Sequence, residues 1–563
     1  MIRAVLLCLG FTFALLVSTT SGATPVELLP LVPDDYSFCL VGHRATTALS
    51  SPADSKFAKA FWQSPLVKEA ASSPDIARLL TVKDQLVREL GVKDPELLEL
   101  AFGGTVLLTY RKPAEGKPET EAGLLILHTE QGKKLRESVD HINQLQIKGG
   151  ELRAIEEVKH PTPYWKRAKS DSTASPEYFW IEDGLLIFTS NETLLRETLA
   201  RRKSPPAKSL AATQLKALGL EEAPLCLLMN PRSFDREVEA GVNAGKPGER
   251  TVLDLFGKTW KAIDQIGLHL SRKPDLTIGL TVGCEMERLP LAVKALVAGF
   301  NQPLRSWDRL PENALFALVL PFQTSKLDGF LKSVVPEGDH RKMREAVLSA
   351  VRPLGEDIEW DALLNTFGPE IAVWGSPPDA KHPGLDPSVG VAIPLELKHA
   401  EASAKMLSEG IDFLIRLLCL SDSGYRVSTV KGEGFSIKKL SHPDFPAGVE
   451  PCYAIRSGTL LMASHPRMIE QYSPVARESK PRAVNPLIRL SGPTWGEHLV
   501  KAAPRMASKM SADPKEQERM TRLLKGLAPV VAELDRIEFN LTTEKNRARL
   551  QLQFIEQPAR PVK

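Results

Sequence analysis

The stretch Glu177–Leu199 reads EYFWIEDGLLIFTSNETLLRETL, and 274 residues later Pro451–Ser473 reads PCYAIRSGTLLMASHPRMIEQYS. Both stretches have a β-prone run, a turn pair that ends in glycine, a second β-prone run and a helical segment. The turn pairs Asp183-Gly184 and Ser457-Gly458 suit β-hairpins, because glycine tolerates the positive φ that such turns need. The two stretches therefore predict the same strand–turn–strand–helix unit twice.

The start of each helix carries its own signal. Asn191 can cap the first helix by accepting a free backbone N–H. Pro466 suits the opening turn of the second helix, where a missing N–H costs nothing.

Four more blocks recur in the same order along the chain. They pair residues 32–42 with 310–320, 97–104 with 362–369, 225–234 with 486–495, and 263–285 with 534–556. Five collinear blocks predict a tandem duplication. We expect one repeat at residues 26–288, a connecting helix or linker at 289–304, a second repeat at 305–557 and a tail at 558–563.

Amphipathic helical segments separate the predicted strand pairs. In residues 132–145, Leu135, Val139 and Ile142 fall on one helical face, and residues 399–418 show the same periodicity. Hairpins that alternate with such helices favour a mostly antiparallel sheet. We therefore predict two tandem related α+β domains, each with helices packed on one face of its sheet.

The first 23 residues have the pattern of a secretory signal peptide. Arg3 is their only charge, an apolar run extends from Ala4 to Val17, and the small residues Ser21-Gly22-Ala23 follow. Cleavage after Ala23 would place the mature protein in the periplasm or outside the cell. The alternative, retention of this segment as a membrane anchor, stays open. No later stretch has the length and apolarity of a membrane span.

The balance of charges argues against several classes of partner. The formal net charge is +3, and removal of the signal segment takes away one positive charge. Nucleic-acid binding and membrane-surface binding both need clustered basic residues. We therefore expect neither kind of partner.

Five cysteines remain after signal cleavage. When Cys39, Cys226, Cys284 and Cys452 are aligned with the other repeat, each falls on an apolar residue, which favours buried free thiols. A disulfide between Cys39 and Cys226, or between Cys226 and Cys284, stays open because secreted proteins permit it.

The sequence contains none of the common catalytic motifs. It has no HExxH, GxSxG, CxxC or GxxxxGK[ST], so we expect no catalytic, cofactor or metal site. His160 and His442 recur in the two repeats, each followed by proline, and are the candidates for a polar site because histidine binds metals and transfers protons near neutral pH. The alternative interpretation of both is an exposed imidazole at a strand end.

Aromatic residues cluster before and within the first hairpin. Tyr164, Trp165, Tyr178, Phe179 and Trp180 can line a groove for a sugar or peptide, but alternation along the strands assigns half of them to the core.

The blocks LPENALFALVL, FGPEIAVW and YAIRSGTLLMASHP resemble uncharacterised predicted secreted bacterial proteins of the domain-of-unknown-function kind. The resemblance covers most of both repeats and rests on scaffold features. It implies a fold and export, and it implies no activity.

The favoured interpretation is a non-catalytic extracytoplasmic scaffold that binds a ligand or an envelope protein, with no cofactor. The cleft between two related domains is a natural place for a ligand. The alternatives are a hydrolase that uses His160 or His442 with a nearby carboxylate, and a structural subunit of a larger assembly.

Overall fold

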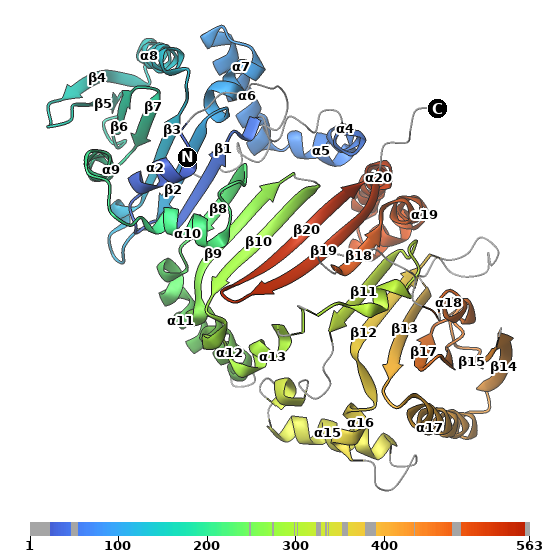
Figure 1. Cartoon of the computed structure of the whole chain (residues 1–563). Helices are drawn as coiled ribbons and strands as arrows, with labels where there is room; N and C mark the ends of the chain where they lie inside the picture. The colour runs from blue at the N-terminus through green and yellow to red at the C-terminus, as the bar shows by residue number, and fades with distance from the viewer. Residues whose placement is uncertain are drawn as a thin grey trace. The chain divides into compact units, whose positions relative to one another are not determined.

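The computed structural model describes most of the chain after residue 22 (Figure 1). The described residues are 23–46, 55–246, 249–272, 275–297, 299–300, 302–321, 328–332, 335, 337–351, 359–377, 390–432, 434–446, 448–473, 475 and 486–557. The predicted signal peptide, apart from Ala23, and the predicted tail lie outside them.

The chain folds into two compact units. The first ends at Glu285 and the second begins at Met286, except that residues 242–259 belong to the second unit. Helix α13 (Leu291–Val297) lies in the segment that we expect to connect the repeats.

The described part of the first unit forms an antiparallel sheet of ten strands. Their order is β10–β9–β8–β1–β2–β3–β7–β6–β5–β4. The bounds are β1 (Phe38–His43), β2 (Thr105–Arg111), β3 (Ala122–His128), β4 (Leu152–Val158), β5 (Tyr164–Lys169), β6 (Glu177–Glu182), β7 (Leu185–Thr189), β8 (Leu225–Met229), β9 (Ile263–Ser271) and β10 (Leu276–Cys284).

The described part of the second unit also has ten antiparallel strands. Their order is β20–β19–β18–β11–β12–β13–β17–β16–β15–β14. The bounds are β11 (Phe316–Pro321), β12 (Phe367–Ser376), β13 (Gly390–Leu397), β14 (Arg426–Gly432), β15 (Phe435–Ser441), β16 (Cys452–Arg456), β17 (Thr459–Ala463), β18 (Pro486–Ser491), β19 (Leu534–Glu544) and β20 (Arg547–Glu556).

The two orders are the same when ten is added to each strand number of the first unit. A tandem duplication predicts this shared connectivity, and the duplication itself, a statement about ancestry, stays a prediction. Below, "equivalent" residues are those that share a register position in this common order.

Helices connect the strands in both units. In the first unit they are α2 (Pro25–Leu28), α4 (Lys56–Gln63), α5 (Pro65–Ala71), α6 (Pro74–Leu90), α7 (Asp94–Phe102), α8 (Gly132–Lys148), α9 (Glu192–Lys203), α10 (Leu210–Leu218) and α11 (Asp235–Asn243). Helix α12 (Arg250–Ala262) follows, and the second unit adds α15 (Glu337–Val351), α16 (Trp360–Leu364), α17 (Ala400–Ser421), α18 (Pro466–Glu470), α19 (Gly492–Met510) and α20 (Pro514–Ala532). Short 3₁₀ turns include η1 (Leu29–Leu31), η3 (Pro118–Thr120), η4 (Pro231–Phe234), η5 (Met286–Arg288) and η6 (Arg305–Asp308).

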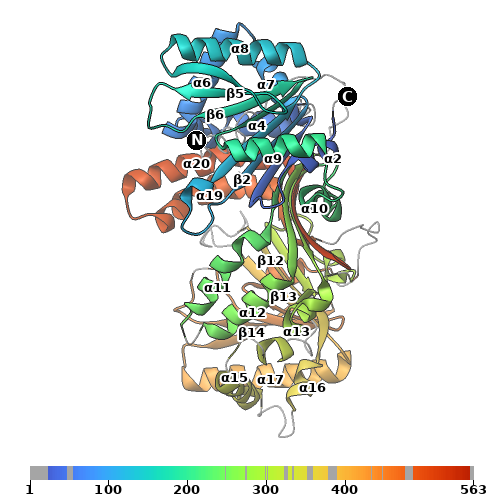
Figure 2. The same cartoon turned by 90° about the vertical axis from the view of Figure 1, so that its left-hand side faces the viewer.

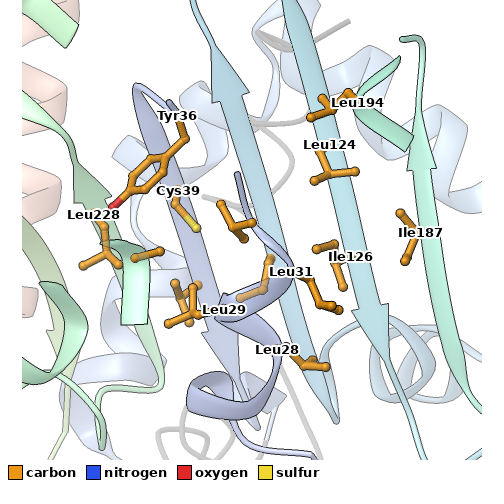
Figure 3. Close-up of a cluster of buried hydrophobic side chains, with 14 of the residues drawn as sticks. Leu28, Leu29, Leu31, Tyr36, Cys39, Leu124, Ile126, Ile187, Leu194 and Leu228 are labelled. Carbon is orange, nitrogen blue, oxygen red and sulfur yellow. The ribbon is translucent and has the colours of Figure 1, made fainter. Parts of the chain in front are cut away.

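Helices cover both faces of each sheet. In the first unit, α2, α9 and α10 pack on the face that carries Cys39 and Ile187 (Figure 3). Helices α7 and α8 pack on the other face, which carries Leu127 and Phe179. Figure 2 shows α8 and α9 on opposite sides of β5 and β6. In the second unit, α18 and α17 contribute to separate clusters in the same way. The prediction of an α+β fold with antiparallel sheets is confirmed, but the expected single helical face is wrong.

The reason lies in the strands themselves. In β6, Tyr178 and Trp180 belong to one core cluster and Phe179 and Ile181 to the other. A strand that is apolar at every position is buried on both sides, whereas one-sided burial gives alternation of apolar and polar residues.

The predicted turns and caps form as expected. Asp183 and Gly184 have φ of 48° and 77°, and Ser457 and Gly458 have φ of 48° and 70°. Positive φ at both central residues is the requirement of a type I′ hairpin. Asn191 Oδ1 accepts the Leu194 N–H at 3.0 Å, and Pro466 is the first residue of α18.

All five cysteines among the described residues are free, and four of them are buried. Burial raises the pKa of Cys226 and of Cys452 to about 12, so both are thiols at neutral pH. Neither of the disulfides that the sequence left open is present in the structure.

Candidate functional site

His160 lies in the loop between β4 and β5 of the first unit. Its ring packs against Tyr164, with ring centroids 5.8 Å apart. Its Nδ1 atom is buried and has no hydrogen-bond partner in the described part of the chain. The structure therefore brings no carboxylate to this histidine.

His442 follows β15 in the second unit, and both of its ring nitrogens are occupied. Nδ1 accepts the backbone N–H of Asp444 at 3.1 Å, so Nε2 carries the proton and donates to Asp422 Oδ2 at 3.2 Å. The ring also contacts Tyr425 and Phe445, with centroid distances of 4.3 and 5.8 Å. Both ring nitrogens are thus engaged in hydrogen bonds within the protein.

Among the residues that the structure describes, no hydroxyl or thiol is hydrogen-bonded to His160 or His442. In the described part of the chain, His442 thus has a carboxylate beside it but no hydroxyl or thiol that could act as a nucleophile. Asp422 is the residue directly after helix α17. Its pKa is lowered, mainly by the hydrogen bond that it accepts from the Gly424 N–H and to a smaller extent by the one from His442. This geometry indicates a structural role for His442.

The aromatic group of the first hairpin forms no groove. Tyr164, Tyr178, Phe179 and Trp180 are buried within the two clusters of the first unit. Alternation along the strands assigned half of the five aromatic residues to the core, and the structure buries these four, because β6 is covered on both faces.

A cavity of about 390 Å³ lies on the α17 face of the sheet in the second unit. Four of its lining residues form one row across the strands: Ile393 of β13 pairs with Met462 of β17, which pairs with Tyr453 of β16, which pairs with Lys438 of β15. Ile415 of α17 completes this side of the wall. Apolar lining with a few polar groups is typical of small-molecule sites.

The first unit has bulkier side chains at two positions of the equivalent row. There Leu125 of β3, Phe188 of β7, Phe179 of β6 and Trp165 of β5 pair in the same sequence. The Trp165 and Phe179 rings stack, with centroids 6.3 Å apart and planes 18° apart. Three aromatic residues thus stand where the second unit has Met462, Tyr453 and Lys438.

The neighbouring row differs in polarity as well. In the first unit Arg167 pairs with Glu177, and their side chains form a buried ion pair of 2.6 Å. Arg167 also donates to Gln146 of α8. The equivalent pair in the second unit is Leu440 and Pro451, both of which line the cavity. The second unit therefore has an apolar wall at the place of a charged cluster.

One polar corner interrupts the apolar wall. Asp412 of α17 accepts hydrogen bonds from Lys438 Nζ and from the Tyr453 hydroxyl. Burial and the hydrogen bond to Asp412 raise the pKa of Tyr453, so it is a neutral donor at all physiological pH values. The pKa of Asp412 is lower than its ordinary value. Burial is the largest single effect and raises this pKa, but the hydrogen bonds from Lys438 and Tyr453 outweigh the effect of burial.

A second depression, of about 700 Å³, lies in the first unit at the end of β3, the start of α8 and the β6–β7 turn. Its charged lining residues have both signs: Lys133 and Arg136 face Glu130, Glu182 and Asp183. Arg136 already bonds Asp140 at 3.2 Å. The groups in this depression do not converge on one ligand chemistry.

The comparisons with known proteins are negative. No family model, no curated protein and no solved structure matches the chain. The resemblance to secreted bacterial proteins of the domain-of-unknown-function kind therefore stays a prediction.

Two searches of the described residues bear on binding. No helix in those parts of the chain has the length and apolarity to cross a bilayer. Within the same ranges, His, Cys, Asp and Glu side chains form no group of three or more that could hold a metal ion.

The sequence analysis missed the cavity residues. The signal was present in the aligned repeats, where two large aromatic residues of the first copy align with a smaller and a charged residue of the second. It becomes readable only when strand register shows that Ile393, Met462 and Lys438 belong to one row across the strands.

Proposed function

We propose that the protein is a non-catalytic extracytoplasmic binding protein whose second unit holds an apolar ligand. One observation carries the proposal: two units with the same strand order differ at one row, which is filled by Trp165, Phe179 and Phe188 in the first and lines a cavity in the second. Export is supported by the pattern of residues 1–23.

Burial of apolar surface explains why this difference points to a ligand. The cavity is open to solvent and its lining is mostly apolar, with Met462 exposed by 37 %, so apolar side chains contact water in the free protein. A ligand that fills the cavity removes this apolar surface from water together with its own.

The nearby surface of α17 extends the apolar region. Phe413, Leu414, Leu417 and Leu418 are each exposed by 38 to 44 %, at helical spacings of one, three and four residues. Of these residues, Leu418 is three positions after Ile415, which lines the cavity, so the two side chains are neighbours on the helix. An apolar molecule in the cavity can thus gain a further contact at Leu418.

Titration with the fluorescent probe N-phenyl-1-naphthylamine tests the proposal. We expect saturable binding at one site per chain, and at least a ten-fold loss of affinity in the double variant Lys438→Trp/Met462→Phe, which copies the filled row of the first unit. Val500→Phe is the matched control because Val500 is exposed by 52 % on α19 and does not line the cavity.

Circular dichroism and thermal unfolding establish that each variant is folded. If the wild-type protein does not bind the probe, or if the filled variant binds it as well as Val500→Phe does, the proposed binding function is wrong. Fractionation of cells that express the full chain tests export.

A further inference from the structure

We propose that the ligand of this cavity is an amphiphile with a straight alkyl chain and a carboxylate head group, which Lys438 binds. This inference rests on the proposed binding function and specifies the chemistry of its ligand.

Lys438 is the only lysine or arginine that lines the cavity, and the row from Ile393 to Tyr453 continues directly from it. An ammonium group has three N–H donors. In the described part of the chain, Asp412 is the one acceptor bonded to Lys438 Nζ. Donors therefore remain for an acceptor on a bound molecule.

The balance of charge at this corner favours an anion over a cation. Asp412 is already engaged by two donors, Lys438 Nζ and the Tyr453 hydroxyl. An incoming cation would have to share with Lys438 a carboxylate whose two oxygens each already accept a hydrogen bond. An incoming carboxylate instead meets a cation with unused donors, and hydrogen bonds between charged groups are the stronger ones.

The shape of the wall favours an unbranched chain. The apolar residues follow the row across neighbouring strands, which are spaced about 4.8 Å apart. Val391, Leu440 and Pro451 add apolar surface beside that row. A head group at Lys438 thus places an extended chain along Met462 and Ile393.

The first unit supplies an internal comparison. The position equivalent to Lys438 is Trp165, and the positively charged Arg167 nearby is paired with Glu177 within a buried cluster. At this row the first unit thus has the Trp165 ring where the second unit has the Lys438 ammonium, and we assign the carboxylate site to the second unit.

Calorimetric titration of the full-length mature protein with decanoate, decanol and decyltrimethylammonium tests the head group. We expect decanoate to bind about ten-fold more tightly than decanol, and decyltrimethylammonium to bind most weakly. Hexanoate, octanoate and decanoate should gain about four-fold in affinity per added methylene, the gain that transfer of one methylene from water predicts.

Two variants give effects of opposite sign. Lys438→Met should lower decanoate affinity to that of decanol and leave decanol binding within two-fold. Asp412→Asn removes the competing carboxylate and should raise decanoate affinity several-fold. Binding of N-phenyl-1-naphthylamine reports whether each variant retains the cavity.

The outcomes separate the two proposals. Equal binding of decanoate and decanol by the wild-type protein, or an unchanged preference in Lys438→Met, overturns the carboxylate assignment while the binding function stands. Absence of binding by all three amphiphiles and by the neutral probe overturns the binding function itself. The comparison of head groups on the wild-type protein needs no variant, so misfolding of a variant does not leave the assignment undecided.

Discussion

Trp165 and Lys438 occupy the same register position in two units of the same strand order. Trp165 pairs with Phe179 in the first unit, and Lys438 pairs with Tyr453 in the second. The indole stacks on its neighbour's ring, whereas the ammonium lies 5.9 Å from the centroid of the tyrosine ring and bonds Asp412. The same strand order thus carries a row of packed aromatic side chains in one unit. In the other unit it carries an apolar cavity with a charged side chain at one end.

The ion pair of the first unit should be costly to break. Replacing Arg167 by methionine leaves Glu177 buried, with Lys169 at 3.0 Å as its remaining cation. We expect a loss of about 3 kcal/mol in the free energy of unfolding, as is typical when one partner of a buried pair is removed. Urea unfolding followed by circular dichroism measures it.

The double variant Arg167→Met/Glu177→Met is the control for this loss. It removes both charges, so it should be more stable than the single variant Arg167→Met. A single variant as stable as the wild-type protein would show that the pair lies in a more solvated place than the structure indicates.

The two candidate histidines should differ in their effect on stability. His442→Ala removes two hydrogen bonds and two aromatic contacts, and we expect a loss of about 2 kcal/mol in the free energy of unfolding. His160→Ala should cost less than about 1 kcal/mol, because its Nδ1 makes no hydrogen bond in the described part of the chain.

Both histidine variants should bind N-phenyl-1-naphthylamine as the wild-type protein does. A hydrolytic activity that either substitution abolishes without loss of folding would revive the hydrolase interpretation.

Replacing the turn glycine Gly184 by alanine should destabilise the protein more than replacing Gly91, the glycine that ends helix α6. Both have positive φ, 77° and 64°, but a Cβ on Gly184 would lie 2.2 Å from the Thr129 carbonyl oxygen, whereas a Cβ on Gly91 would meet nothing within 4 Å. Gly91→Ala carries only the cost of the left-handed conformation, about 1 kcal/mol, and Gly184→Ala adds a backbone clash for a total of about 3 kcal/mol. Thermal unfolding of the pair checks the difference, and equal losses would argue against this packing of the hairpin.

Acid should weaken the link between α17 and its sheet. The pKa of Asp412 is lower in the folded protein than its ordinary value near 3.8. A carboxylate with a lowered folded pKa stabilises the protein above its unfolded pKa, and this contribution is lost as the pH falls through the folded pKa. The stability difference between wild type and Asp412→Asn should therefore be constant from pH 7 to about pH 5 and shrink below about pH 4.

Urea unfolding at stepped pH measures this dependence. A difference that persists unchanged to pH 2 would show that Asp412 does not bond Lys438 and Tyr453.

Local signals were readable from the sequence because they depend on neighbouring residues. The positive φ of Gly184 and Gly458 and the cap at Asn191 each follow from side-chain chemistry within a few positions. The collinear blocks predicted two related α+β units because they preserve the spacing of hairpins. The unbroken apolar run of β6 also indicated that helices cover both faces of the sheet. This was missed because the hairpins suggested burial on one face only.

The candidate site was not readable in this way. Ile393, Met462 and Lys438 come from three strands, and only strand register places them in one row. The partner of His442 is Asp422, which is 20 residues away and is placed by the end of α17. Contacts of this kind depend on how elements pack, and a single sequence carries no local mark of them.

The central claim is that an apolar ligand occupies the row that begins at Lys438. NMR of the protein labelled with ¹³C at its methionine methyl groups, titrated with decanoate, tests it most directly. The account predicts a saturable shift of the Met462 methyl signal, whereas the signal of Met510, which is exposed by 61 % on α19 and is absent from the cavity wall, stays in place. A Met462 signal that remains unchanged at saturating decanoate would contradict the account.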